Sequence, residues 1–236
     1  MIPNFSRRSE REEWMDDPVV EARQLVKTLD DLARINALLG GYSATIDGIE
    51  ELIDQERNAL SVLDVGTGGG DVPRHMDWWA DRRGLDIYVL GVDISTVAVR
   101  YARQRSKAYH HLEFRRRDLF ELSSRERFDI VHASLMLHHL SDQEAIEALQ
   151  KMYEISTLGV VINDLHRHPL GYLGSQVVLR LLTRNSMVHH DGPLSVLRGF
   201  RRRELQRLVE AAGLPTPQIQ WRPFFRWQCV IRKEVS

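Results

Sequence analysis

The stretch Val62–Val72, V-L-D-V-G-T-G-G-G-D-V, decides the fold of this chain. An apolar run ends at an acidic residue, Asp64, and glycines then occupy positions 66, 68, 69 and 70. A second apolar run, Tyr88–Val92, is followed directly by Asp93. Glycine permits backbone torsions and a close ligand approach that a Cβ would block, and sheets of this kind bind ligands at the carboxyl ends of their strands. The two stretches together predict a nucleoside-binding crevice.

The rest of the chain after residue 60 supports a sheet around that crevice. Short apolar runs alternate there with helical segments, which is typical of a mostly parallel sheet covered on both faces. The runs are Ser61–Val65, Ile87–Val92, Leu112–Arg115, Phe128–Ala133 and Gly159–Asn163. Two further runs, Gln218–Trp221 and Arg226–Arg232, lie close together around Pro223. We expect them to pair as an antiparallel hairpin that ends the sheet.

The regions outside these runs predict helices. Residues 19–39 carry apolar residues near a 3.6-residue period, and Gly40-Gly41 should stop that helix. A second helix is expected over 45–58, and a third over 199–213. We expect an N-terminal helical cap at 1–58, a main domain at 59–236 and a lid-like insertion at 164–200 after the fifth strand. The apolar segment 169–183 is interpreted either as a buried helix that completes the core or as a lid.

The composition is that of an ordinary soluble globular protein. Hydrophobic residues make up 43% of the 236 positions and charged residues 28%, and the net charge is −1. No global field therefore drives the chain toward nucleic acid or an anionic membrane. The single Cys229 excludes an intramolecular disulfide and a cysteine-only zinc site. We expect a cytoplasmic protein, since the N-terminus is too charged for a signal peptide and no apolar run could span a membrane.

The acidic residues near the glycines narrow the choice of ligand. A dinucleotide site needs a small residue at the sixth position from Gly66, where this chain has Asp71, and a carboxylate there would repel pyrophosphate. Asp64 suits a ligand with a cationic group. S-adenosylmethionine carries an ammonium, a sulfonium and a ribose but no phosphate. Asp93 could accept both ribose hydroxyls, because an ionised carboxylate is an acceptor with two oxygens.

At this point the sequence resembles the class I S-adenosylmethionine-dependent methyltransferases. D-V-G-T-G-G-G is similar to the first motif of that family, and G-V-D-I-S to its second. R-R-R-D-L, F-D-I-V-H-A-S-L-M-L-H-H-L and R-R-R-E-L-Q-R-L-V-E-A-A-G-L follow in the family's order. The resemblance covers about residues 60–232 and is strongest to enzymes that act on quinones, phenols and polyketides. It implies a Rossmann-like, doubly wound α/β fold with seven strands, mostly parallel, and an antiparallel last strand.

The resemblance also implies which residues hold the cofactor. Gly66, Thr67 and Gly68 would lie against the methionine part, and Asp64 near its ammonium. Asp93 would hold the ribose, with Ile94 against the adenine. Asp118 would bind the adenine amine, with Leu119 packed nearby. The alternative roles for Asp118 are a helix N-cap or a partner for the arginines at 115–117. Ala133 and Ser134, after the fourth strand, would approach the methyl donor.

The histidines are the candidates for catalysis. His139 follows the fourth predicted strand and His166 the fifth, so both strand ends should open on the crevice. Histidine can accept a proton from a phenol near neutral pH. A metal site built from His166 and His168, or from His189, His190 and Asp191, is disfavoured because those spacings are loose. We therefore expect no metal.

These observations favour an enzyme that methylates a small, hydrophobic acceptor, with S-adenosylhomocysteine as the second product. The acceptor group would be a phenol, quinol or polyketide-type hydroxyl. The alternatives are a C- or N-methyltransferase on a small molecule and a non-catalytic, cofactor-binding regulatory module, whereas Asp71 disfavours a nicotinamide oxidoreductase. Aromatic residues do not alternate with the arginines at 115–117 and 198–203 as they do in a stacking platform, so no nucleic-acid partner is expected. A homodimer through the N-terminal helices is possible.

Overall fold

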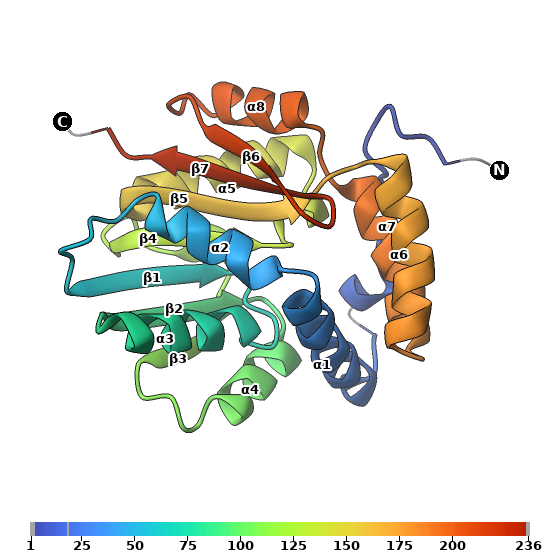
Figure 1. Cartoon of the computed structure of the whole chain (residues 1–236), viewed down its shortest axis with the longest axis horizontal. Helices are drawn as coiled ribbons and strands as arrows, with labels where there is room; N and C mark the ends of the chain where they lie inside the picture. The colour runs from blue at the N-terminus through green and yellow to red at the C-terminus, as the bar shows by residue number, and fades with distance from the viewer. Residues whose placement is uncertain (1–2, 18, 235–236) are drawn as a thin grey trace.

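A computed structural model describes residues 3–17 and 19–234, and its central feature is a twisted sheet (Figure 1). In this described part of the chain seven strands pair in the order β3-β2-β1-β4-β5-β7-β6. They are β1 (Ala59–Val65), β2 (Asp86–Asp93), β3 (Leu112–Arg116), β4 (Phe128–Ser134), β5 (Ser156–Leu165), β6 (Gln218–Arg222) and β7 (Arg226–Arg232). β7 is antiparallel to both neighbours, and the other pairs are parallel. The predicted fold class is confirmed.

Helices cover both faces of this sheet. They are α1 (Ala22–Leu38), α2 (Gly41–Glu50), α3 (Asp71–Arg83), α4 (Thr96–Arg105), α5 (Asp142–Ile155), α6 (Pro169–Leu182), α7 (Ser186–Arg198) and α8 (Arg202–Ala211). Three 3₁₀ turns, η1 (Trp14–Asp16), η2 (Leu119–Glu121) and η3 (Leu137–His139), complete the described elements. One apolar cluster joins α5 and α8 to the sheet, and a second joins α2 and α3 to its other face. The strand order reverses between β1 and β4, where such folds bind ligands.

The N-terminal helices differ in detail from the prediction. Gly40 adopts a left-handed backbone with φ of 65° and ends α1 as expected, but α2 begins immediately at Gly41. The second predicted helix, 45–58, was therefore wrong at both ends, because α2 stops at Glu50. The following segment 54–58, D-Q-E-R-N, has no apolar side chain that a further helical turn could bury. α2 packs Ile46 and Ile49 into the same cluster as β1.

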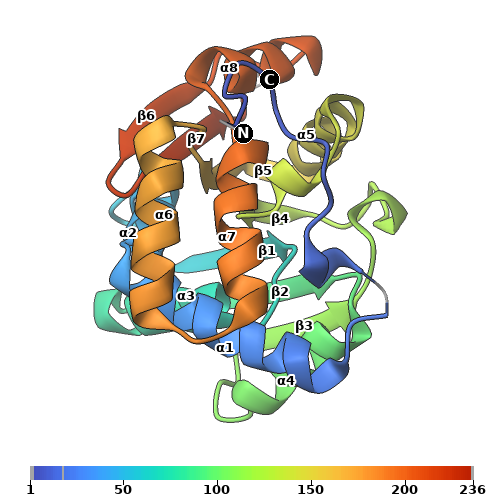
Figure 2. The same ribbon diagram turned by 90° about the vertical axis from the view of Figure 1, so that its right-hand side faces the viewer.

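The insertion after β5 forms two packed helices, α6 and α7, beyond the carboxyl ends of the parallel strands (Figures 1 and 2). α7 contacts η1, η3 and α1, whereas α6 packs mainly on α7. α6 buries only Gly171 and Leu179, so it is not a helix that completes the core. Among the residues described, no helix has both the length and the apolar character needed to cross a bilayer.

Candidate functional site

The loop after β1 is shaped by glycines. Gly66, Gly68 and Gly70 have φ values of 67°, 52° and 69°, a left-handed backbone that costs residues with a Cβ. A Cβ on Gly66 would lie 2.5 Å from Cγ of Met136, and one on Gly70 would lie 2.8 Å from the Phe114 ring. The Thr67 amide donates to the Val92 carbonyl at 3.0 Å, which ties the loop to the end of β2. The loop therefore exposes backbone at the predicted crevice.

Asp93 ends β2 beside this loop. Its carboxylate accepts the Gly68 amide at 2.9 Å and the Ser95 amide at 2.8 Å, one on each oxygen. Burial raises the pKa of Asp93 above its ordinary value, against the lowering effect of these two amides. Each oxygen has two acceptor positions, so one on each is left for a ligand hydroxyl. The next residue, Ile94, has a side chain that is 70% exposed. The pair fits a ribose followed by an apolar ring.

The end of β4 contributes Ala133 and Ser134. Ala133 is buried, and Ser134 Oγ is a buried oxygen without a hydrogen-bond partner among the described residues. Leu135, the next residue, has a left-handed backbone with φ of 52°. Buried polar atoms are normally paired, so the unpaired hydroxyl at this strand end fits a site that receives a polar ligand.

Two of the expected cofactor residues make contacts within the protein. Asp64 is buried in β1 and its Oδ1 lies 2.6 Å from Nδ1 of His132, directly opposite in β4. Its contact with a ligand ammonium stays a prediction. Asp118 accepts the Phe120 amide at 3.0 Å and caps η2, which is one of the alternative roles considered for it. Leu119 is buried in the main core cluster.

His139 lies at the end of η3 and pairs with a residue from the N-terminal segment. Its Nδ1 is 2.8 Å from Oδ2 of Asp16, and its side chain is 22% exposed. A positive charge on this ring would lower the pKa of Asp93, so the histidine and the predicted ribose carboxylate lie within electrostatic reach of each other. The structure therefore brings His139 to the same edge of the sheet as the glycine loop.

The neighbouring His138 has a different environment. Its ring is buried between two carboxylates, with Nδ1 2.7 Å from Asp164 and Nε2 3.5 Å from Glu13. Burial alone would lower the pKa of His138, but Asp164 and Glu13 together raise it to about 9. The imidazolium in turn outweighs burial and lowers the pKa of both carboxyls. His138 is charged at neutral pH and is unsuited to act as a base.

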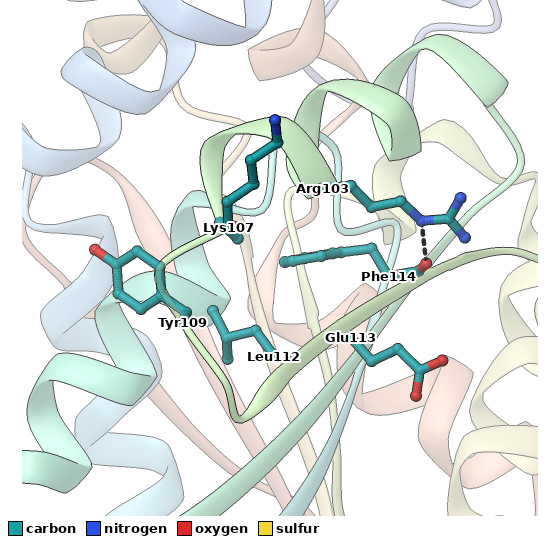
Figure 3. Close-up of a pocket in the computed structure, with 7 residues that line it drawn as sticks. Arg103, Lys107, Tyr109, Leu112, Glu113 and Phe114 are labelled. Atoms are coloured by element: carbon teal, nitrogen blue, oxygen red, sulfur yellow. Dashed lines mark hydrogen bonds between the residues drawn. The ribbon is translucent and has the colours of Figure 1, made fainter.

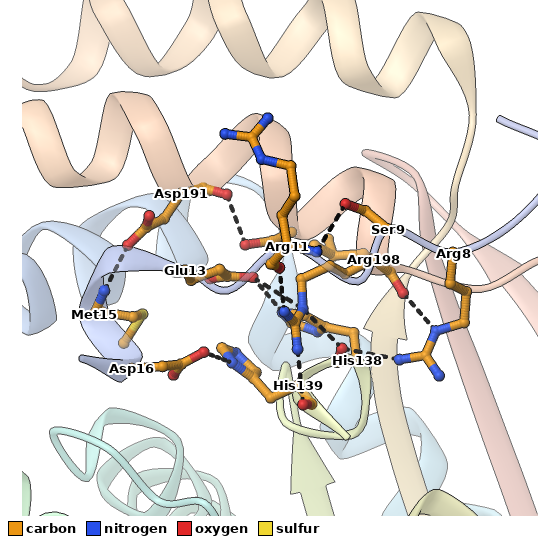
Figure 4. A network of polar contacts seen from close by, with 12 residues as sticks. Arg8, Ser9, Arg11, Glu13, Met15, Asp16, His138, His139, Asp191 and Arg198 are labelled. Carbon is orange, nitrogen blue, oxygen red and sulfur yellow. Dashed lines mark hydrogen bonds and ion pairs between the residues drawn. The ribbon is translucent and has the colours of Figure 1, made fainter. Parts of the chain in front are cut away.

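Arginines and an aspartate hold the N-terminal segment over η3 (Figure 4). Arg8 donates to the carbonyl oxygens of His138 and Leu140, at 2.9 and 2.7 Å. Arg198 donates to the carbonyls of His138, His139 and Arg11. Asp191 accepts the amides of Trp14 and Met15 at 2.9 and 3.0 Å. The segment that contains Glu13 and Asp16 is thus bound to η3 through Arg8 and Arg198, and to α7 through Asp191.

His166 belongs to another cluster. It follows β5 and packs against Trp227, with ring centroids 4.6 Å apart, and against His168 and Phe225. Burial lowers the pKa of His166 to about 4, with help from the charges of His168 and two arginines. Its Nδ1 is buried and has no hydrogen-bond partner in the described part of the chain. The two histidines expected to share one site therefore have separate surroundings.

One group of residues has the spacing of metal ligands, namely Glu13, His138 and His139, whose ligand atoms lie within 4.8 Å of one another. Both ring nitrogens of His138 already face carboxylates. A protonated ring has no lone pair for a metal. His190, from the other arrangement considered, pairs with Asp191 at 2.7 Å and stacks on Trp14. The contacts of His138, His139 and His190 therefore hold the N-terminal segment in place.

A surface depression of about 460 Å³ lies away from this edge (Figure 3). It is lined by Arg103, Lys107, Tyr109 and the segment 112–114. Those last residues begin β3, so the depression opens at the amino end of that strand. Parallel sheets bind their ligands at the carboxyl ends, and the depression is not the candidate site.

Comparison with known proteins matches this chain to methyltransferases. Residues 62–159 match a family described as a methyltransferase domain. The ubiquinone biosynthesis O-methyltransferase of Rhodopseudomonas palustris (strain BisB5) is 28% identical over 144 residues, which are 56% of this chain and 54% of that protein. The ribosomal protein L11 methyltransferase of Dictyoglomus turgidum (strain DSM 6724 / Z-1310) is 36% identical over 98 residues, or 41% of this chain and 31% of that protein. The chain thus covers about half the length of the first relative and about a third of the length of the second.

The fold also has solved counterparts. The crystal structure of a SAM-dependent methyltransferase from Aquifex aeolicus superposes with a TM-score of 0.61 at 17% identity. The superposition covers 90% of this chain and 98% of that one. At this identity the likeness shows a shared fold.

The N-terminal contacts of Glu13 and Asp16 were not found from the sequence, since nothing in E-R-E-E-W-M-D distinguishes them from solvated acidic residues.

Proposed function

We propose that this chain is an S-adenosylmethionine-dependent methyltransferase, because residues 62–159 match the model of a family described as a methyltransferase domain. The methyl acceptor is a small hydrophobic molecule, and the acceptor atom is a hydroxyl oxygen of the phenol, quinol or polyketide type. S-adenosylhomocysteine leaves as the second product. The protein is cytoplasmic in this proposal, and pairing through its N-terminal helices is its expected mode of dimerisation.

The observation that carries the proposal is the carboxylate of Asp93 beside the glycine loop. Its two oxygens are fixed by amides of Gly68 and Ser95 and keep one acceptor position each. A ribose offers two adjacent hydroxyls with a matching spacing, and the exposed Ile94 would then cover the adenine. Asp71 stands where a pyrophosphate would need a small residue, which supports a cofactor without phosphate.

We assign the other cofactor contacts from the positions of these residues near the carboxyl ends of the strands. The backbone of Gly66, Thr67 and Gly68 would lie against the methionine part, with Asp64 nearby. Asp118 and Leu119, after β3, would lie toward the adenine. Ala133 and Ser134 end β4 at the same edge, and the unpaired Ser134 hydroxyl is available to the ligand. S-adenosylmethionine, when bound, supplies a methyl group that its sulfonium has already activated.

His139 is our candidate for the base. Asp16 holds Nδ1, so in the neutral ring Nε2 is the nitrogen that can accept a proton from the acceptor hydroxyl. Positioning supplies much of the rate of such a displacement, and a base adds to it. His166 is the second candidate, because its low pKa keeps the ring neutral at physiological pH. Its separate cluster beside Trp227 makes it the weaker of the two.

The class of acceptor is supported by sequence similarity and by the apolar insertion. The first relative is named as an O-methyltransferase of ubiquinone biosynthesis. The second relative is named for a ribosomal protein, so the shared domain alone does not determine the acceptor. C- and N-methylation of a small molecule, and cofactor binding without catalysis, remain the alternatives to the proposed O-methylation.

Isothermal titration with S-adenosylmethionine and with S-adenosylhomocysteine tests the cofactor assignment. We expect both to bind the wild-type protein, and Asp93→Ala to weaken binding by about 1.5–3 kcal/mol because a charged acceptor is lost. Asp86→Ala, at the exposed start of the same strand, is the matched control and should bind like wild type. The absence of binding to wild type, or equal binding by Asp93→Ala, would refute the assignment.

A further inference from the structure

The outer face of α6 is apolar and exposed. Its side chains at four positions are between 56% and 80% exposed, and the spacings of three, four and four residues align them in one stripe along the helix. They are Leu170, Leu173, Val177 and Leu181. The opposite face of α6 packs against α7 (Figure 2). A helix that is apolar on both faces is normally covered on both, and contiguous exposed apolar side chains mark interaction sites.

The β6–β7 hairpin extends this apolar surface. Phe225 packs against the backbone of Gly171 in the first turn of α6, so the tip of the hairpin adjoins the helix. The next residue toward the tip, Phe224, is 55% exposed, and Trp221 is 51% exposed. Phe224 and Phe225 both have left-handed backbones, with φ of 61° and 58°. Both residues belong to the tight turn at 223–225 that joins β6 to β7, and this turn presents the Phe224 ring to the outside.

The exposed charges close to this surface are mostly positive. Residues 165–203 contain seven arginines, of which Arg167 and Arg198 are buried, and a single acidic residue, Asp191, which is buried against the N-terminal segment. Residues 211–233, which include the hairpin, contain no acidic residue, although Arg222 pairs with Asp47 at 2.9 Å. Arg180 and Arg184 are exposed at the carboxyl end of α6, and Arg201 lies close enough to His166 to lower its pKa at the other end. The net charge of −1 for the chain conceals this basic region.

We propose that the stripe on α6 and the tip of the β6–β7 hairpin, together the α6 face, dock on the surface of an anionic lipid bilayer. Leucine, valine, phenylalanine and tryptophan side chains enter the boundary between headgroups and acyl chains, and the flanking arginines contact anionic headgroups. A bilayer complements both the apolar and the basic part of this surface. The inference goes beyond the proposed methyl transfer and does not depend on it.

The α6 face lies on the same side of the molecule as the candidate site. α6 and α7 lie on the side of the molecule toward which the parallel strands point (Figures 1 and 2). A bilayer on α6 would therefore face the same side as the candidate site. An apolar acceptor dissolved in the bilayer would be concentrated next to the enzyme.

Flotation with lipid vesicles tests the proposal. We expect the full chain to float with vesicles of equimolar phosphatidylcholine and phosphatidylglycerol, to float less with phosphatidylcholine alone, and to be released in part by about 0.5 M NaCl. The triple variant Leu173→Ser/Val177→Ser/Leu181→Ser should lose about tenfold or more in vesicle affinity. Arg180→Gln/Arg184→Gln should reduce the preference for phosphatidylglycerol. Trp78→Ser, at a 52% exposed position on α3, is the control and should float like wild type.

Three outcomes would overturn the proposal. Wild type that does not float with anionic vesicles excludes it, and so does a triple variant that floats like wild type. A wild-type dimer that the triple variant converts to a monomer, in the absence of vesicle binding, would assign the stripe to a second copy of this chain. Titration of the same variants with S-adenosylmethionine separates a failure of the docking proposal from a failure of the proposed function. None of the substituted residues lies at the glycine loop, so the variants should bind the cofactor like wild type.

Discussion

The glycine loop at 66–70 and the N-terminal segment at 5–17 reach the same edge of the sheet but are held there differently. Backbone torsions and main-chain hydrogen bonds shape the loop, as in the bond from Thr67 to Val92. Charged side chains make most of the polar contacts of the N-terminal segment, beside a backbone bond from Ser9 to Leu197 and the stack of Trp14 on His190 (Figure 4). Arg8 and Arg198 bind carbonyl groups, and Glu13 faces the buried His138. The loop depends on the absence of side chains, whereas the segment depends on charges that must stay paired.

This difference predicts different sensitivities to substitution. A Cβ added in the loop causes a local steric cost, which neighbouring side chains can partly relieve. Removing one member of a buried charged pair leaves the other charge desolvated and without a partner, which costs more. The network around His138 is therefore the more fragile of the two regions, although it carries none of the expected cofactor contacts.

Asp164→Ala should have the largest effect. The Asp164 carboxylate is buried and accepts His138 Nδ1 at 2.7 Å and the amides of His138 and Leu165. Without it the raised pKa of His138 loses its main support. We expect the free energy of unfolding to fall by about 3–5 kcal/mol, measured by urea denaturation.

The matched control for that variant is Asp142→Ala. Asp142 also pairs with a cation of this region, Arg8, but its side chain is 73% exposed. A solvated pair of this kind contributes at most about 1 kcal/mol. Similar losses for the two variants would show that burial does not set the strength of the network, and the comparison between the two regions would fail.

Gly70→Ala should have the next largest effect and tests the loop. At this position the backbone is left-handed, and a Cβ would lie 2.8 Å from the Phe114 ring. Strain and overpacking together should cost about 2–4 kcal/mol in unfolding free energy. Gly84→Ala is the control at the other end of α3, because it has a similar φ of 67° but nothing within 4 Å of the added carbon. It should cost only about 1 kcal/mol. Equal costs would contradict a role for close packing at Gly70.

The sequence predicted the loop region because its parts lie at the ends of two strands that follow each other in the chain. Val62–Val72 and Asp93 lie at the ends of β1 and β2, which are neighbours in the sheet, so the glycines and the carboxylate meet at one edge. The parallel sheet and its antiparallel last strand followed from apolar runs of typical length. The helix boundary at Gly41 was missed because two adjacent glycines both fit a helix stop, and only the first adopts the left-handed backbone.

The network could not be predicted because its members are distant in sequence. Asp16 and His139 are separated by 123 residues, and no local pattern relates them. The contact between Asp64 and His132 depends on β1 and β4 being neighbours, which is a matter of strand order. His139 and His166 both follow strands, yet the chain after β5 turns toward the β6–β7 hairpin and carries His166 to Trp227. Pairings of this kind become visible only in three dimensions.

The pH dependence of stability should show a smaller effect that separates the two histidines. The folded-state pKa of His138 is raised from 6.5 to about 9, so the folded state binds the proton more tightly than the unfolded chain. This stabilisation is complete below pH 6.5 and is lost as the pH rises through 9. Between about pH 7 and about pH 8.5 the free energy of unfolding should fall by about 1–2 kcal/mol. Urea denaturation at a series of pH values measures it.

His166 should act on the opposite side of neutrality. Its pKa is lowered to about 4, so the unfolded chain binds the proton more readily and the stability should fall as the pH drops from 6.5 toward 4. His138→Asn should therefore flatten the alkaline limb of the stability curve and leave the acidic limb, whereas His166→Asn should do the reverse. If His138→Asn left the alkaline limb unchanged, the ring would not be the charged centre that links the N-terminal segment to β5. The segment would then owe its position to its other contacts, among them those of Arg8, Arg198 and Asp191.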